Sequence, residues 1–149
     1  MNVLLDTNVL LRRLEPAHPQ HPLVSGAMAK LAAGGVNFCL VSQTLYELWV
    51  VMTRPVAVNG LGKSVADAST VLNGLAATYT VSDDNSAVRV VWQQLVTTHA
   101  VLGKNAHDAR LVAAMTVHNL THLLTFNAAD FQRFPTITVL TPSAVLAVP

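Results

Sequence analysis

A chain of 149 residues is long enough for one compact domain and leaves little room for a second. Hydrophobic residues make up 52% of the sequence and charged residues only 11%, which excludes an intrinsically disordered protein. The net charge of +1 is too small to indicate nucleic-acid binding by itself, so any such binding needs a local basic patch and a bound cation. We therefore expect a single domain over residues 1–149.

The first half of the chain alternates short apolar runs with helical patterns. These patterns predict strands at residues 2–5 and 36–41, and helices at residues 9–14, 23–33, 42–53 and 64–77. Gly34 is expected to end the second helix, and Ser42 and Ser64 to cap the third and fourth. The stretch 55–63, which begins with a proline and contains Asn59-Gly60, is expected to be a loop.

The second half continues the same alternation. Here we predict strands at residues 78–81, 122–125 and 137–140, helices at 86–100 and 106–119, and a short helical loop at 127–134. Strands that alternate with helices favour a parallel sheet covered on both faces. The predicted fold is therefore a three-layer α/β/α sandwich with a central parallel sheet of four to five strands.

The composition also predicts where the protein works. Asp6 and Arg12-Arg13 interrupt the first apolar stretch, so no secretion signal is expected, and the charge-free run 111–129 is too polar for a membrane span. A single cysteine, Cys39, allows no intrachain disulfide and suits a reducing compartment. We expect a cytoplasmic protein without membrane contact. Its apolar composition favours a protein partner or a homodimer.

Two acidic residues of the first half are placed where ligands bind. Asp6 follows directly on the first predicted strand, and open α/β sheets bind ligands outside the carboxyl ends of their strands. A helix cap is an equally simple role for Asp6. Glu47 lies in a helix that is apolar nearly all round, so burial is expected and the carboxylate needs a cation or hydrogen bonds. The alternative for Glu47 is a solvent-facing side chain.

Three further candidates lie in the second half. Asp108 shares a helix face with Leu111 and Val112, so it is expected to point toward the sheet from the first turn. Its alternative role is to complement the helix dipole. Asn127 and Asp130 follow the strand at 122–125, at the same sheet edge as Asp6, or they form a capping turn.

Convergence of these groups would create a metal site. Several carboxylates in one place repel each other, and a divalent cation removes that repulsion. Ligands that are all oxygen atoms suit Mg²⁺ or Mn²⁺, which can activate water and neutralise charge on a phosphate.

Four segments resemble the motifs of the PIN-domain family, in the same order and spacing and over essentially the whole chain. They are residues 4–10 (LLDTNVL), 42–47 (SQTLYE), 107–110 (HDAR) and 124–131 (LTFNAADF). Among PIN proteins the chain is most similar to VapC toxins. The resemblance implies an α/β/α sandwich, metal-dependent endonuclease activity on RNA, inhibition by a cognate antitoxin and dimerisation.

The resemblance also implies roles for individual residues. Asp6, Glu47 and Asp108 match the acidic metal-binding core. Asn127 stands where some members have an aspartate, and Asp130 lies one helical turn later, so both are candidates to complete the catalytic set. Thr7 and Thr125 resemble supporting hydroxyls that orient ligands or water.

Basic residues beside the third motif are candidates for RNA contact. His107 precedes Asp108 and Arg110 follows it by two positions. The simpler interpretations are a turn residue for His107 and a solvated surface charge for Arg110.

The sequence predicts a metal-dependent endoribonuclease toxin. The first alternative is a PIN-like binding module that has lost catalysis, which the uncharged Asn127 favours. The second is a phosphohydrolase that forms an aspartyl phosphate, but such enzymes usually carry a second aspartate where Asn8 stands here.

Overall fold

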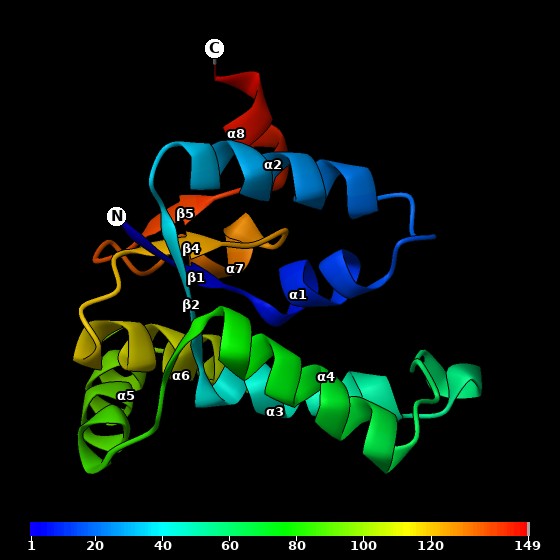
Figure 1. Cartoon of the computed structure of the whole chain (residues 1–149). Helices are drawn as coiled ribbons and strands as arrows, with labels where there is room; N and C mark the ends of the chain where they lie inside the picture. The colour runs from blue at the N-terminus through cyan, green and yellow to red at the C-terminus, as the bar shows by residue number, and fades with distance from the viewer. Residues whose placement is uncertain (149) are drawn as a thin grey trace.

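The centre of the protein is a five-stranded parallel β-sheet with strand order β3-β2-β1-β4-β5 (Figure 1). The computed structural model describes residues 1–148. The strands are β1 Asn2–Leu5, β2 Asn37–Val41, β3 Thr80–Ser82, β4 His122–Leu124 and β5 Thr138–Leu140. The predicted parallel sheet of four to five strands is confirmed.

The central strands bury side chains on both faces of the sheet. In β1, Val3 and Leu5 contribute to one apolar core and Leu4 to the other, and all three are fully buried. Successive side chains of a strand point to opposite faces, so a strand covered on both sides must be apolar throughout. This explains the uninterrupted apolar run before Asp6.

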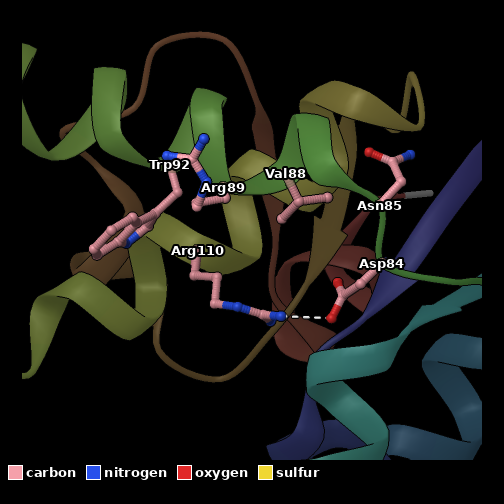
Figure 2. A pocket seen from close by; sticks show the side chains of 6 residues that line it. All are labelled: Asp84, Asn85, Val88, Arg89, Trp92 and Arg110. Atoms are coloured by element: carbon pink, nitrogen blue, oxygen red, sulfur yellow. Dashed lines mark hydrogen bonds and ion pairs between the residues drawn. The ribbon is translucent and has the colours of Figure 1, made fainter.

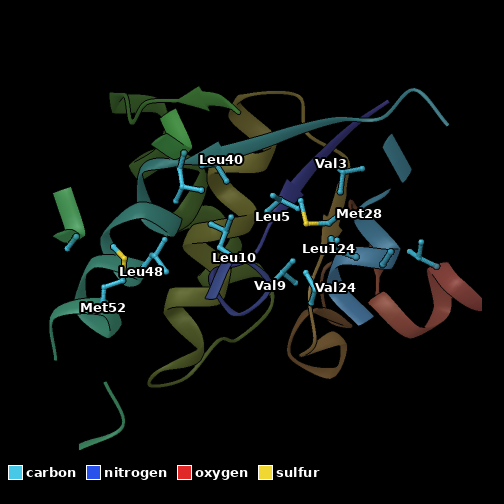
Figure 3. Close-up of a cluster of buried hydrophobic side chains, with 14 residues drawn as sticks. Val3, Leu5, Val9, Leu10, Val24, Met28, Leu40, Leu48, Met52 and Leu124 are labelled. Atoms are coloured by element: carbon cyan, nitrogen blue, oxygen red, sulfur yellow. The ribbon is translucent and has the colours of Figure 1, made fainter. Parts of the chain in front are cut away.

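One helical layer packs on the Val3 and Leu5 face. Its helices are α1 Thr7–Leu14, α2 His21–Ala33, α3 Ser42–Thr53, α4 Val65–Thr78 and α8 Pro142–Ala147, with a 3₁₀ turn, η1 Val56–Val58, between α3 and α4. Figure 3 shows the core they form with the sheet, in which Leu40 and Leu124 of the strands accompany Leu10 and Leu48 of the helices.

The second helical layer covers the opposite face. It consists of α5 Ser86–Thr98, α6 Asn105–Val117 and α7 Ala128–Phe131. Helix α6 lies directly on the sheet, because Ala109, Val112 and Ala113 are fully buried, and α5 packs on its outer side. The three-layer α/β/α sandwich predicted from the sequence is thereby confirmed.

Several local predictions are corrected by the structure. Ser42 does not cap α3; it is the first residue of the helix, and its hydroxyl accepts a hydrogen bond from the Asp84 backbone N–H at 3.1 Å. Helix α3 is not buried all round, since Tyr46 and Val50 are 60% and 55% exposed. Helix α8 and the turn η1 were not predicted. Among residues 1–148, no helix is long and apolar enough to cross a lipid bilayer.

The strand order creates a crevice beside β1. The chain runs outward from β1 through β2 to β3, and then returns to place β4 on the other side of β1. Ligands of open α/β sheets bind at such a reversal, outside the carboxyl ends of the strands. Leu5 pairs with Leu124 at this end, so Asp6 and Thr125 are neighbours although 119 positions separate them.

Candidate active site

A polar pocket of about 260 Å³ opens at the carboxyl ends of β1 and β4. Its walls come from four separate parts of the chain. It is lined by Asp6, Thr7, Asn8, Leu11, Glu47, Val51, Asp108, Asn127 and Phe131. The structure thus brings together Asp6, Glu47, Asp108 and Asn127, four of the five catalytic candidates predicted from the sequence.

Asp6 is held at the bottom of this pocket by buried hydrogen bonds. Its Oδ2 accepts from the Thr125 hydroxyl at 2.6 Å and from the Asn8 side-chain amide at 2.9 Å. Asp6 occupies the N-cap position of α1, but its side chain makes no capping hydrogen bond. The carboxylate is therefore directed into the pocket and not toward the helix that follows it.

Burial raises the pKa of Asp6 to about 6, because the ionised carboxyl group loses its hydration. Interactions with the Thr125 hydroxyl and with the nearby Thr7 backbone oppose this rise, and the negative charges of Glu47 and Asp108 add to it. Asp6 is only 8% exposed, so solvent screens these charges poorly. A cation in the pocket would offset both the burial and the repulsion.

The hydroxyl of Thr125 is the centre of this hydrogen-bond network. It also accepts from the Asn8 amide at 3.2 Å and from the Asn127 backbone N–H at 3.0 Å, and Thr125 is fully buried. We expect Thr125→Val, which keeps the side-chain shape, to lower the free energy of unfolding by about 1–3 kcal/mol, the cost of leaving buried polar groups unpaired. Urea unfolding at pH 7 measures this loss.

A matched control for this substitution is available on the surface of α5. The Thr97 hydroxyl donates to the Gln93 carbonyl at 2.8 Å, and Thr97 is exposed. Thr97→Val is expected to change stability by less than about 0.5 kcal/mol. Equal losses in the two variants would contradict a special role for the Thr125 hydroxyl.

Glu47 reaches the pocket from α3 and is fixed at both of its oxygens. Oε2 accepts from the Thr7 hydroxyl at 3.0 Å, and Oε1 accepts from the Gln43 side-chain amide at 2.8 Å. Gln43 lies one helical turn before Glu47, so the two side chains share a helix face. The half-buried Glu47 therefore has a defined orientation and is not a freely moving surface residue.

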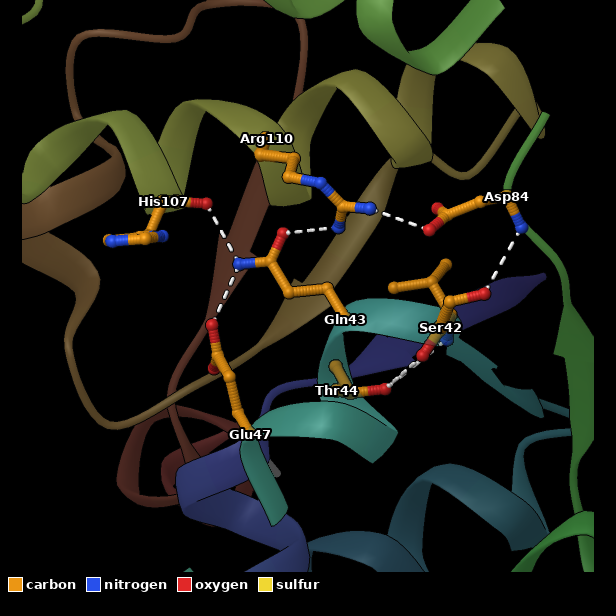
Figure 4. Close-up of polar contacts among 8 residues, drawn as sticks. Ser42, Gln43, Thr44, Glu47, Asp84, His107 and Arg110 are labelled. Atoms are coloured by element: carbon orange, nitrogen blue, oxygen red, sulfur yellow. Dashed lines mark hydrogen bonds and ion pairs between the residues drawn. The ribbon is translucent and has the colours of Figure 1, made fainter. Parts of the chain in front are cut away.

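The amide of Gln43 is itself held in one orientation. Figure 4 shows its Nε2 facing Glu47 and the His107 carbonyl, to which it donates at 2.9 Å. Its Oε1 accepts from Arg110 at 3.1 Å, and Arg110 forms an ion pair with Asp84 at 2.5 Å. Because a guanidinium group only donates, it fixes the amide with Nε2 toward Glu47. A chain of polar contacts thus runs from the β3–α5 connection to the pocket.

Asp108 enters the pocket from the first turn of α6, and it is half-buried. Its pKa is raised by burial first, and then by the charges of Asp130 and Glu47; His107 and Arg133 act in the opposite direction. Asp130 is exposed on α7 and is not part of the pocket wall, whereas Asn127 is. The fourth side of the pocket is therefore formed by the Asn127 amide. The Asp130 carboxylate lies outside the wall but acts on the pKa of Asp108.

The two basic candidates lie beside the pocket. His107 is exposed and takes part in the polar network through its backbone carbonyl. Arg110 is half-buried between Gln43 and Asp84. Its position makes it a structural link between α6, α3 and the β3–α5 connection.

The donor set of the pocket fits a hard divalent cation. The carboxylates of Asp6, Glu47 and Asp108 with the Asn127 amide are oxygen ligands of the kind that Mg²⁺ and Mn²⁺ prefer. Burial raises the pKa of Asp6 and of Asp108, and neighbouring carboxylates raise both further, so a cation in the pocket would stabilise the ionised forms. Over residues 1–148, no three His, Cys, Asp or Glu side chains are already grouped closely enough to hold a metal ion.

Three residues of the network, Asn8, Gln43 and Asp84, are not among the site residues predicted from the sequence. The signal for Asn8 was its place two residues after Asp6, which allows an amide to reach back to the carboxylate. The signal for Gln43 was its spacing of four residues from Glu47 on one helix. No local signal indicated Asp84, because its partner Arg110 is 26 positions away.

No family model matches the sequence, and no curated protein matches it. Solved structures do match. The chain is similar to a chain in the structure of VapBC2 from Rickettsia felis, which was solved bound to a DNA fragment from the promoter of these proteins. The TM-score is 0.70 and the sequence identity is 16%, and the match covers 95% of this chain and 98% of that chain.

Two further structures extend this similarity. A toxin–antitoxin complex from Klebsiella pneumoniae gives a TM-score of 0.63 at 21% identity, over 94% of this chain and 97% of that one. VapC20 from Mycobacterium tuberculosis, described as a toxin that cleaves the sarcin–ricin loop, gives a TM-score of 0.57 at 15% identity. This match covers 81% of this chain and 86% of that chain. At these identities the similarity concerns the fold: the chain has the PIN-like α/β/α fold of these toxin–antitoxin structures.

Proposed function

We propose that this protein is a metal-dependent endoribonuclease that hydrolyses RNA phosphodiester bonds, and that it is the toxin of a VapBC-type pair. The observation that carries the proposal is the meeting of Asp6, Glu47, Asp108 and Asn127 in one pocket at the sheet reversal. The similarity to VapC20, a toxin described as cleaving the sarcin–ricin loop, supports RNA as the substrate class. An RNA substrate also favours a cytoplasmic location.

In this proposal the carboxylates of Asp6, Glu47 and Asp108 hold Mg²⁺ or Mn²⁺. Such an ion supplies water activation and neutralises charge that grows on the phosphate. The chain itself provides orientation. Thr125 and Asn8 fix the Asp6 carboxylate, and Thr7 and Gln43 fix that of Glu47, so two of the three proposed ligands have a defined orientation.

An antitoxin and a second copy of the chain are the proposed protein partners. The similarity to VapBC complexes supports an antitoxin. Exposed apolar side chains in one stretch of the chain support a protein contact, because exposed apolar surface commonly marks interaction sites. They lie on α3, on η1 and at the start of α4: Tyr46, Val50, Val56, Val58 and Val65, each more than half exposed.

The test of the proposal is cleavage of a structured RNA in the presence of Mn²⁺ or Mg²⁺, with and without a chelator. We expect cleavage to stop in the chelator and in Asp108→Asn. Glu15→Gln is the matched control, because it removes a carboxylate that pairs with Arg12 outside the pocket, and it should cleave normally. Cleavage that persists in the chelator would contradict the proposal.

A second candidate function is a binding module without catalysis, which the uncharged Asn127 in the pocket wall favours. Calorimetry with Mn²⁺ separates the two candidates. Binding of Mn²⁺ that disappears in Asp108→Asn, together with RNA cleavage, excludes the binding module. Binding of RNA without cleavage at any metal concentration would establish it.

Gln43 is expected to act as a positioning residue for Glu47. Gln43→Ala removes the hydrogen bond to Oε1, so Glu47 loses one of its two fixed contacts. We expect kcat to fall about tenfold or more with little change in KM, because the interaction serves the reacting arrangement and not RNA binding. Steady-state kinetics on a short RNA substrate measure the two constants.

The conservative variant Gln43→Glu provides the contrast. It retains an acceptor for Arg110 but places a second negative charge against Glu47 and the His107 carbonyl. Its activity should fall further than that of Gln43→Ala at pH 8, and its deficit relative to the parent at the same pH should shrink at lower pH, when the new carboxyl group is protonated. A uniform rise of KM in both variants would point instead to a role in RNA binding.

A further inference from the structure

A second pocket, of about 350 Å³, lies between the start of α5 and the first turns of α6. Figure 2 shows Trp92 at one end, Asp84 at the other and the Arg110 side chain between them. It is lined by Asp84, Asn85, Val88, Arg89, Trp92 and Arg110. Its volume falls within the range of small-ligand sites, which is roughly 300–1,000 Å³.

One face of α5 forms most of the wall. Val88 and Arg89 lie three and four residues after the N-cap Asn85, and four and three residues before Trp92, so these side chains lie on the same side of the helix. The indole of Trp92 is half-buried apolar surface and Val88, at 3% exposure, closes the wall from the core, while the Trp92 N–H is already bonded to the Ala106 carbonyl at 2.9 Å. The rest of the wall carries charges of both signs and an amide.

This pocket is connected to the candidate active site by hydrogen bonds. Arg110 lines the pocket and donates to Gln43 Oε1, and Gln43 Nε2 donates to Glu47. Two side-chain contacts therefore separate the second pocket from a carboxylate of the first. Both pockets lie beside the start of α6, which contributes Asp108 to the wall of one and Arg110 to the wall of the other.

We propose that this pocket holds an unpaired nucleobase of the RNA, next to the phosphate that is cleaved. This assignment rests on the proposed function and adds how the RNA substrate is bound. A nucleobase has an apolar face, which fits Val88 and Trp92, and a hydrogen-bonding edge, which fits the donors of Arg89 and Asn85 and the acceptor of Asp84. Arg89 also offers positive charge to the phosphates on either side of the base.

A simple anion site is a poorer fit to the same walls. Arg110, the more buried of the two guanidinium groups, is already neutralised by Asp84, and a carboxylate in the wall repels a free phosphate. The apolar side chains of Val88 and Trp92 also offer no hydrogen bond or charge to a phosphate group. The chemistry of the wall therefore selects the base and not the phosphate group as the part that enters.

The binding test uses the fluorescence of Trp92 in a Trp49→Phe variant, which leaves Trp92 as the one tryptophan of the chain. The probes are the four nucleoside 5′-monophosphates, adenosine and ribose 5-phosphate, all in chelator. We expect saturable quenching by at least one nucleotide and weaker binding of ribose 5-phosphate. Equal affinity for ribose 5-phosphate, or no saturable quenching by any nucleotide, would overturn the proposal.

Arg89→Ala tests the wall without touching the proposed catalytic residues. Arg89 is exposed, and its single side-chain partner in the described structure is Gln93 at 3.4 Å, so the fold should survive. We expect nucleotide affinity to fall about tenfold, as for the loss of one charge-assisted hydrogen bond. Arg13→Ala, at an exposed position of α1, is the matched control and should bind as the parent does.

Kinetics on RNA separate this inference from the nuclease proposal. Arg89→Ala should raise KM about tenfold with kcat unchanged, because it removes binding that is equal in the ground and transition states. If nucleotides bind but RNA is never cleaved, the pocket assignment holds and the nuclease proposal fails. If RNA is cleaved with the same KM by parent and variant, the pocket assignment fails and the nuclease proposal holds.

Discussion

Replacing Asp6 by asparagine is expected to abolish RNA cleavage while making the metal-free protein more stable at neutral pH. Loss of a ligand carboxylate should lower kcat/KM about a hundredfold or more. The gain in stability has a separate cause, because the asparagine oxygen can still accept the hydrogen bonds from Thr125 and Asn8 while the buried negative charge is gone.

The pH dependence of this gain follows from the raised pKa. In the folded protein the pKa of Asp6 is about 6, against 3.8 for the unfolded reference, so the folded state binds the proton more tightly. Stability is therefore lost as the pH rises from about 4 through 6. Above that range the ionised carboxylate costs the folded state roughly 2–3 kcal/mol, and below pH 4 it costs nothing.

The measurement is urea unfolding of parent and Asp6→Asn in chelator at pH 8 and pH 4. We expect the variant to be more stable by roughly 2 kcal/mol at pH 8 and equal to the parent at pH 4. The control is Asp67→Asn, an exposed acid in the first turn of α4, which should retain cleavage and show no gain. A variant that is less stable than the parent at pH 8 would contradict the assigned burial cost.

Addition of Mn²⁺ or Mg²⁺ is expected to stabilise the parent strongly and Asp108→Asn hardly at all. An ion at a hundred times its dissociation constant adds about 2.7 kcal/mol to the free energy of unfolding. The effect should be largest above pH 6, because the cation competes with the proton on Asp6. Below that pH we expect the metal affinity to fall about tenfold per unit.

Thermal unfolding with and without Mn²⁺ at pH 5.5 and pH 8 tests this expectation. Glu15→Gln, whose carboxylate pairs with Arg12 on α1 and not with the pocket, should respond to the ion as the parent does. Stabilisation of Asp108→Asn to the same extent as the parent would place the ion elsewhere. Stabilisation that does not depend on pH would exclude Asp6 as a ligand.

Some local features were predictable and others were misleading. Helix α8 was missed although Thr141 and Pro142 are a regular start signal; the Thr141 hydroxyl accepts from the Ala144 N–H at 3.2 Å. Its six residues are too few to show a helical period. Burial of α3 was inferred from composition, which does not record that Tyr46 and Val50 face outward.

The contacts that orient the candidate ligands differ in how far apart their partners lie in the sequence. Asn8 and Gln43 act over two and four residues, so their spacing was readable in principle. The contacts of Thr125 with Asp6 and of Arg110 with Asp84 join residues that are 119 and 26 positions apart. Nothing in the local pattern of either segment specifies its distant partner.

The amino-acid pattern by itself determined the α/β class, the parallel sheet and the position of Asp6 after a buried strand. It could do so because burial on both faces imposes continuous apolar runs, and because polar residues interrupt those runs where strands end. Only the tertiary structure decided that β4 lies beside β1. Parallel strands present nearly equivalent apolar edges, so their order depends on how the helical layers pack, and that order is what brings Thr125 to Asp6 and Asp108 to Glu47.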